Sequence, residues 1–212
     1  MEYQSRDRRP IPARETQVSQ RAAKFLARTG ISANTISIFS VVFGLAAGAS
    51  FAMTAFSTIP RIWWGLAALF IILRLTANML DGMVAIEKNE TSAVGELFNE
   101  VPDRISDAAT LIGAGFAAHS SAHLGYIAAI LSLFVAYIRA MGNHMNVIGL
   151  FMGPMNKQQR MFSLIGTCLY YLIAPASWSS LPVILLVLWA VNLGAILTIV
   201  RRLRHITAQV KS

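Results

Sequence analysis

The stretch that organises this chain is NMLDGMVAIEKNETSAVGELFNEVPDRISD, residues 78–107. It holds nearly all the acidic residues outside the N-terminal arm, and apolar runs long enough to cross a bilayer flank it on both sides. Carboxylates at membrane depth are costly and usually functional. Polar residues recur in it three or four apart, which is helical spacing: Asn78 and Asp81, then Asn99, Asp103 and Asp107. If the two polar helix faces converge, they offer the oxygen ligands that Mg²⁺ or Ca²⁺ prefers.

The composition indicates a polytopic membrane protein. Of the 212 residues, 55% are hydrophobic and only 13% are charged, and the mean hydropathy is +0.55. The single cysteine, Cys168, excludes an internal disulfide. Basic residues give a net charge of +8 and gather at helix ends and the N-terminus, which favours anionic lipid headgroups over nucleic acid as the partner. Residues 1–30 lack the apolar core of a cleavable signal peptide.

The apolar segments predict an all-α integral membrane protein with six transmembrane helices and an N-terminal interfacial amphipathic helix. The expected membrane helices cover residues 33–56, 61–80, 93–118, 122–140, 157–174 and 181–200. Before them, residues 16–29 place Val18, Ala22, Phe25 and Leu26 at helical spacing, which is typical of a helix lying in the membrane interface. A disordered basic tail is the alternative interpretation of this segment.

The domain organisation follows from these helices. We expect a cytoplasmic arm with the amphipathic helix over residues 1–30, one membrane domain over residues 31–204, and a cytoplasmic tail over residues 205–212. Basic residues gather in the flanks and connections on the side of the two termini, whereas the opposite side holds only Arg61. Because positively charged flanks stay inside, we expect both termini to be cytoplasmic and the membrane to be a bacterial inner membrane.

The spacing of the central stretch resembles the signature of the class I CDP-alcohol phosphatidyltransferase family, D-x2-D-G-x2-A-R-x8-G-x3-D-x3-D. In order, it falls on Asn78, Asp81, Gly82, Ala85, Ile86, Gly95, Asn99 and Asp103. Every spacing fits, and three identities differ: the first and third aspartates are Asn78 and Asn99, and the arginine is Ile86. The chain is most similar to a divergent subset with asparagine at both positions and a further aspartate four residues on, here Asp107.

The resemblance implies an enzyme of phospholipid biosynthesis. Such an enzyme transfers a phosphatidyl group from a CDP-alcohol, such as CDP-diacylglycerol, to an alcohol acceptor and releases CMP, with two ions of Mg²⁺ or Mn²⁺. It implies Asp103 as the general base. The implied metal ligands are Asn78, Asp81, Asn99 and Asp103, and the implied donor-binding residues are Asn34, Gly82, Ala85, Ser92 and Gly95. For Asn34, a helix cap at the start of the first membrane helix, from Ser32 or Asn34 itself, is an equally good interpretation.

The two asparagines remove two negative charges from the implied metal site, although an amide oxygen can still ligate a metal. Our hypothesis is that Asp107, with Glu100 as second choice, supplies the missing charge as a metal ligand. The alternative is that Asp107 pairs with Arg74 or Arg104 inside the bundle. Arg74 lies within an apolar run one turn before the motif, where an unpaired arginine would be costly.

Three basic residues on the expected cytoplasmic face, Arg139, Lys157 and Arg160, predict an anionic acceptor, such as a phosphorylated alcohol. The alternative is that they are basic only because positive charge stays on the cytoplasmic side.

Other functions and an assembly state stay open at this point. A transporter would also carry charges in the membrane but usually has internal repeats, and we find none. A catalytically impaired relative of the family, acting as a lipid-binding or scaffold protein, is the second candidate. Ala109, Gly113 and Ala117 form a stripe of small residues that predicts a homodimer or, alternatively, close helix packing within the protomer.

Overall fold

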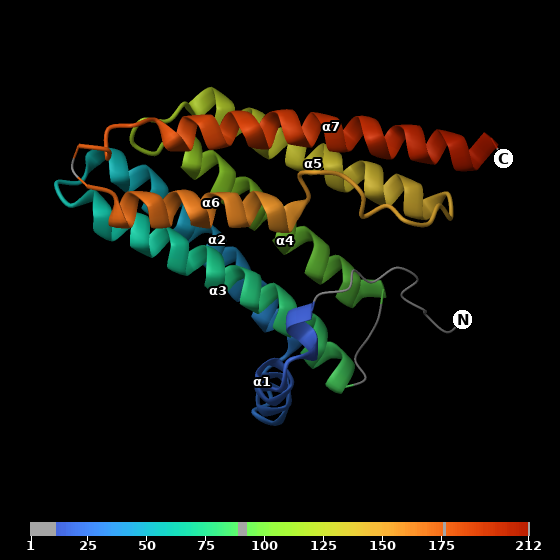
Figure 1. Ribbon diagram of the computed structural model, residues 1–212. Coiled ribbons are helices and arrows are strands. Elements are labelled where there is room, and N and C mark those ends of the chain that lie inside the picture. Colours follow the sequence, from blue (N-terminus) through green and yellow to red (C-terminus); the bar gives the residue numbers. More distant parts are fainter. Residues whose placement is uncertain (1–11, 89–92, 176, 212) are drawn as a thin grey trace.

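The protein, as a computed structural model, is described over residues 12–88, 93–175 and 177–211. Over these ranges it consists of helices joined by short connections (Figure 1). They are η1 (Pro12–Glu15), α1 (Gln17–Arg28), α2 (Ala33–Phe56), α3 (Pro60–Glu87), α4 (Ala93–Gly115), α5 (Ala122–His144), α6 (Lys157–Ile173) and α7 (Val183–Lys211). All seven expected helical segments are therefore present.

Three helices run further than the sequence predicted. The expected ends at residues 80, 140 and 200 are wrong, because α3 continues to Glu87, α5 to His144 and α7 to Lys211. Charged residues such as glutamate, lysine and arginine are good helix formers, so they mark where a helix leaves the apolar layer and do not end it. The segment expected as a tail from residue 205 is helical as far as Lys211.

Four helices, α2, α3, α5 and α7, are long and apolar enough to cross a membrane by length and composition. Neither α4, which carries the charged motif, nor α6, which has 17 residues, belongs to this group. Large apolar side chains such as Phe39, Ile130 and Leu193 are exposed on the four helices, as expected of surfaces that face lipid. Over the described residues the protein is all-helical and consistent with the predicted integral membrane protein, whereas six spans remain a prediction.

An aromatic cluster holds α3 against α6. Trp64 of α3 stacks on Tyr171 of α6 with ring centroids 4.3 Å apart, and Phe51 of α2 meets the Trp64 ring edge-on at 5.7 Å. All three side chains are buried in the main apolar core. Such aromatic pairs contribute about 0.5–1.5 kcal/mol each beyond their buried area. The packing fixes α3 and α6 side by side, so the polar end of α3 faces the start of α6.

A close crossing of α2 and α4 uses the stripe of small residues. A Cβ atom on Gly113 would lie 2.2 Å from the Gly48 Cα, and one on Gly48 would lie 2.4 Å from the Ala109 carbonyl oxygen. Ala117 is also buried. Of the two interpretations of this stripe, packing within the protomer is therefore correct. The small-residue surface from which the homodimer was predicted is therefore covered by α2, and the homodimer itself remains a prediction.

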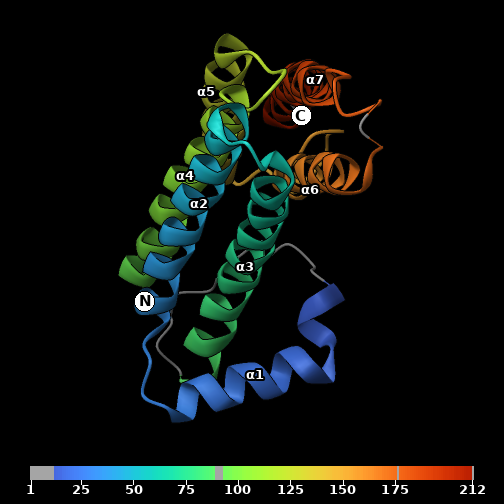
Figure 2. The same ribbon diagram turned by 90° about the vertical axis from the view of Figure 1, so that its left-hand side faces the viewer.

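The amphipathic segment forms α1, which lies across the end of the helices that it contacts (Figure 2). Thr16 caps it, accepting a hydrogen bond from the Ser19 backbone N–H at 3.3 Å. Ala23 is buried against α3, whereas Val18 and Phe25 are largely exposed. This is the distribution that a helix in the membrane interface needs, because its apolar side chains enter the bilayer. The helix itself is confirmed, and its place in the interface remains a prediction.

Candidate active site

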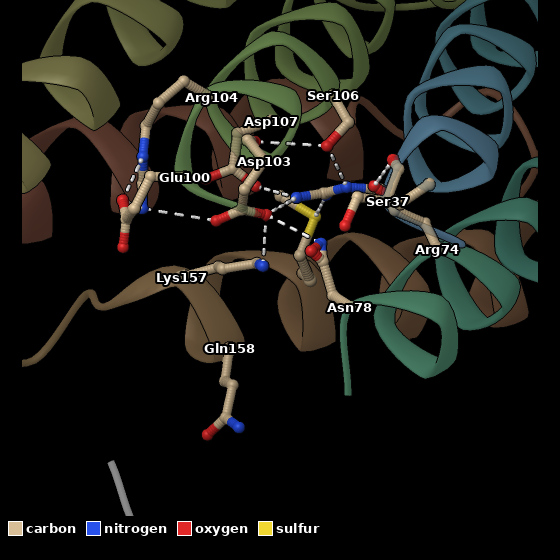
Figure 3. Close-up of polar contacts among 12 residues, drawn as sticks. Ser37, Arg74, Asn78, Glu100, Asp103, Arg104, Ser106, Asp107, Lys157 and Gln158 are labelled. Atoms are coloured by element: carbon tan, nitrogen blue, oxygen red, sulfur yellow. Dashed lines mark hydrogen bonds and ion pairs between the residues drawn. The ribbon is translucent and has the colours of Figure 1, made fainter. Parts of the chain in front are cut away.

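Asp103 on α4 is the centre of a polar cluster contributed by three helices (Figure 3). Its Oδ1 accepts hydrogen bonds from Asn78 Nδ2 at 2.9 Å and from Arg74 Nη2 at 3.3 Å, both on α3. The ammonium group of Lys157, the first residue of α6, pairs with the same oxygen. Asp103 Oδ2 lies 3.3 Å from Arg104 Nη2. The first and fourth positions of the motif thus meet, as the convergence of two polar helix faces predicted.

Asp107 lies one turn further along α4 in a fully buried ion-pair network. Its Oδ1 pairs with Arg74, and its Oδ2 accepts hydrogen bonds from Arg160 Nη2 at 3.0 Å and from Ser132 Oγ at 3.3 Å. The exposed fractions of Arg74, Asp107 and Arg160 are 0%, 1% and 1%. Arg74 also donates from Nε to Ser106 Oγ at 2.8 Å. Both oxygens of Asp107 thus meet buried guanidinium groups, including that of Arg74 as in the structural alternative, and its role as a metal ligand remains a prediction.

Asp81, the second motif position, is held by its own partners. Its Oδ2 accepts a hydrogen bond from Ser37 Oγ of α2 at 2.7 Å, and its Oδ1 accepts one from the Gly82 backbone N–H at 2.6 Å. The side chain is buried. Ser37 was not predicted as a site residue, although a serine within an apolar membrane helix is a recognisable signal for an interhelical hydrogen bond.

Glu100 joins α4 to α5. Its Oε2 accepts from Arg104 Nε at 3.2 Å and Nη2 at 2.5 Å, and its Oε1 accepts from Arg139 Nη2 at 2.5 Å. The Arg139 guanidinium also lies 5.8 Å from the centre of the Phe151 ring, a cation–π contact. Because both carboxylate oxygens have arginine partners, Glu100 as the second-choice metal ligand has no support in this arrangement.

A cavity of about 410 Å³ lies beside Asp103, and many of the predicted site residues line it. The predicted residues that line it are Asn78, Asn99, Asp103, Arg139, Lys157 and Arg160. The predicted residues outside its lining are Asn34, Asp81, Gly82, Ala85, Gly95 and Asp107, and Ser92 lies outside the described residues. The side chains at the first two motif positions therefore point in different directions, with Asn78 facing the cavity and Asp81 facing α2. Most of the predicted donor residues do not surround this cavity.

Asn34, predicted either for the donor or as a cap, does not cap α2. Ser32 does so, because its Oγ accepts from the Thr35 backbone N–H at 3.1 Å. Asn34 itself is exposed in the first turn.

Two cavity-lining arginines were missed by the sequence analysis. Arg202 of α7 is buried and donates from Nη1 to the Val135 carbonyl at 2.7 Å and from Nε to the Met152 carbonyl at 3.2 Å. Because Arg202 stands among the basic residues at the C-terminal end, its charge was explained by membrane topology alone. The one sequence signal for its burial is its place one helical turn after Thr198, on the same face of α7. Arg14 of η1 also lines the cavity, brought there by the N-terminal segment.

The segment that precedes Lys157 is fixed on α7. The Met155 backbone N–H donates to Thr198 Oγ1 at 3.1 Å, and Gly153 has a φ of +123° that brings the chain against the same threonine. Only glycine adopts this conformation readily. Asn156 then begins α6 with a capping box closed by Gln159. The Lys157 ammonium is therefore directed to Asp103 by a rigid cap and anchored loop.

The donor atoms around Asp103 limit how a divalent metal can bind. Among the described residues, no group of three or more His, Cys, Asp or Glu side chains is arranged to hold a metal ion. The implied ligands provide two carboxylates, Asp81 and Asp103, and the amide oxygens of Asn78 and Asn99. Mg²⁺ commonly takes one or two carboxylates and completes its shell with water and phosphate oxygens. By their chemical type these donor atoms thus suit a divalent ion that shares its shell with a bound diphosphate, and of the two carboxylates it is Asp103 that lines the cavity.

Comparisons with known proteins agree with this fold. No protein-family model matches the chain. It is 26% identical over 153 residues to inner membrane protein YnbA of Escherichia coli, covering 71% of this chain and 74% of that protein. It is also 29% identical over 142 residues to an uncharacterized protein of Aquifex aeolicus, covering 65% of this chain and 66% of that protein.

The solved structures similar to this one include phosphatidylinositol phosphate synthase (PgsA1) of Mycobacterium tuberculosis. With CDP-DAG bound, that protein matches 90% of this chain and 94% of its own with a TM-score of 0.75 and 19% identity. In complex with manganese and citrate, it matches 89% of this chain and 88% of its own with a TM-score of 0.73 and 20% identity. At this level of identity, the similarity establishes the fold.

Proposed function

We propose that this protein is a CDP-alcohol phosphatidyltransferase. It transfers a substituted phosphate group, such as phosphatidyl, from a CDP-alcohol such as CDP-diacylglycerol to an alcohol acceptor, and CMP is released. The observation that carries the proposal is the hydrogen bond from Asn78 to Asp103 beside the cavity, since it joins the two ends of the family's signature. The shared fold with a synthase that has been crystallised with CDP-DAG supports it.

The chemistry assigned to Asp103 is proton transfer. An acceptor hydroxyl gives its proton to the carboxylate, its oxygen attacks the phosphorus that carries the lipid, and the bond from that phosphorus to the bridging oxygen of the diphosphate breaks, so that CMP leaves. Asp103 Oδ1 already accepts from Asn78 and Arg74 and pairs with Lys157. We therefore assign the proton to Oδ2, which lies 3.3 Å from Arg104 Nη2. A positioned base of this kind contributes about 10²–10⁴-fold.

A divalent ion, Mg²⁺ or Mn²⁺, fits this site together with the donor. Asp81, Asp103 and the amide oxygens of Asn78 and Asn99 would hold it, and it would neutralise negative charge on the diphosphate. The family resemblance implies two such ions.

The acceptor is proposed to be anionic. Arg139 and Lys157 line the cavity with Asp103, and both are suited to bind a phosphate. Arg160 also touches the cavity, but its guanidinium is almost fully buried and held by Asp107 and Ser132. We therefore assign Arg160 to the support of the site, and Arg139 with Lys157 to the acceptor.

The second candidate is a protein that binds a CDP-lipid without turning it over. It is favoured by the ion pairs, because Glu100, Asp103 and Asp107 all face arginine or lysine in this arrangement. A site in which the base is permanently paired would hold an anionic lipid but abstract no proton.

One experiment separates the two candidates. The full-length protein in detergent is given CDP-diacylglycerol, Mg²⁺ and a panel of alcohols that includes phosphorylated ones, and both CDP-diacylglycerol binding and CMP release are measured. Acceptor-dependent CMP release that disappears in Asp103→Asn supports the enzyme. Binding without CMP release for any acceptor supports the second candidate, and the absence of binding contradicts both.

A further inference from the structure

The balance of charge around Asp103 differs from that of a site built for two divalent ions. The ion-paired carboxylates around Asp103 are Glu100, Asp103 itself and Asp107, and their cations are Arg74, Arg104, Arg139, Lys157 and Arg160. Asp81, held by Ser37 and the Gly82 N–H, is a fourth carboxylate near Asp103. Four carboxylates face five cations, so the cluster carries a net positive charge before any metal enters.

Most of these carboxylates already have cationic partners. Both oxygens of Asp107 meet buried guanidinium groups, and both oxygens of Glu100 meet arginines of α4 and α5. That leaves Asp81, and Asp103 only in part because Arg74, Arg104 and Lys157 already face it, where four aspartates would stand if Asn78 and Asn99 were acidic. Each divalent ion brings two positive charges, and like charges close together in a poorly solvated site repel strongly. A second ion would therefore meet an excess of positive charge that even a diphosphate only partly offsets.

The Lys157 ammonium already places a positive charge directly against Asp103. It pairs with Asp103 Oδ1, the same oxygen to which Asn78 donates. The side chain is placed there by the Asn156 cap and by the loop anchored on Thr198. Figure 3 shows its ammonium group below Asp103 and joined to it by a dashed line, while the neighbouring Gln158 points away.

We propose that the Lys157 ammonium takes the place of one of the two divalent ions, so that each chain binds a single divalent ion, together with the diphosphate of the donor. This inference rests on the proposed function. The lysine balances part of the negative charge on Asp103, and the single ion would share Asp103 with it and be held besides by Asp81 and the amide oxygens. Asn78 and Lys157 then act together, since the neutral amide of Asn78 donates to the same Asp103 oxygen with which the lysine pairs.

Counting bound metal tests the proposal without turnover. Full-length protein in detergent is saturated with CDP-diacylglycerol, no alcohol is added, and Mn²⁺ bound per chain is measured by electron paramagnetic resonance. We expect one ion in the wild type, two in Lys157→Met, and one in Lys157→Arg, which keeps the charge. Lys24→Met, which removes an exposed lysine from α1, is the matched control and should bind one ion.

Several results would overturn the inference. Two ions in the wild type would mean that Lys157 moves aside, and one ion in a correctly folded Lys157→Met would mean that the lysine does not exclude the second. If Lys157→Met does not fold, the wild-type count still decides. No ion in a wild type that binds CDP-diacylglycerol would overturn the metal but not donor binding, whereas failure to bind CDP-diacylglycerol would overturn the proposed function and this inference with it.

Discussion

Replacing Asp107 with asparagine tests whether this residue is a metal ligand or a structural partner. The change leaves two guanidinium groups, those of Arg74 and Arg160, buried beside a neutral amide. Removing one partner of a buried ion pair costs about 3–5 kcal/mol. Arg74 keeps its ion pair with Asp103 at 3.3 Å, and Arg160 keeps Ser132 at 2.9 Å. We therefore expect the lower end of the range, about 3 kcal/mol.

For a domain of this size, a loss of 1 kcal/mol lowers Tm by about 2–4 °C, so Asp107→Asn should lower Tm by about 6–12 °C. Thermal unfolding of the protein in detergent, followed by tryptophan fluorescence, measures this shift. The Mg²⁺ concentration needed for half-maximal CMP release, measured on the same preparation at a permissive temperature, should stay within about twofold of the wild type, because a twofold change corresponds to about 0.4 kcal/mol.

Glu87→Gln is the matched control, because Glu87 is an exposed acidic residue at the end of α3. It should change stability by less than about 0.5 kcal/mol. A rise of tenfold or more in the metal requirement of Asp107→Asn, with Tm unchanged, would refute the reasoning and restore Asp107 as a ligand.

Three further predictions follow from the contacts of the site and the bundle. Asp103→Asn should lower kcat for CMP release by about 10²–10⁴-fold while CDP-diacylglycerol binding persists, and wild-type rates would remove Asp103 from the mechanism. Gly113→Ala should prevent stable folding, because its Cβ would lie 2.2 Å from the α2 backbone. Gly166→Ala is the control, and because nothing lies within 4 Å of the added Cβ it should raise stability by about 0.5–1 kcal/mol. Equal Tm values for the two variants would contradict the close crossing of α2 and α4. Arg139→Gln should raise the acceptor KM more than the donor KM, whereas the exposed Arg201→Gln should change neither, and equal effects would leave both arginines with a topological role.

The elements of the fold were predictable because they follow from local sequence. Apolar length sets the membrane helices, and helical spacing sets which polar residues share a face. The meeting of Asn78 with Asp103 follows from the same rule, since the polar faces of two helices in an apolar bundle turn toward each other.

The partners of the charged residues were not predictable, because they depend on how distant helices cross. Nothing in the sequence distinguishes Arg160, buried against Asp107, from Lys157, placed on Asp103, although they lie three residues apart. The same limit applies to Arg202, which looked like one of several terminal basic residues and is buried against α5 and the loop before α6. For this reason the sequence left two interpretations of Asp107 open, a metal ligand or a partner of arginine. The packing of α3 against α6 brings Arg74 and Arg160 to Asp107 and so favours the arginine partner.

The asparagine at position 78 and the cations around Asp103 explain each other. An aspartate there would place a second carboxylate about 2.9 Å from Asp103 Oδ1, and two like charges at that distance in a poorly solvated site need a strong cation between them. Asparagine removes this need, because its amide nitrogen donates to Asp103 while its oxygen remains a candidate ligand. Lys157 and Arg74 can then balance Asp103 without crowding by a second acid. The departure from the signature is thus compatible with a working site. In such a site, the fixed positive charges of Lys157 and Arg74 balance Asp103, as metal ions do where all the motif positions are aspartate.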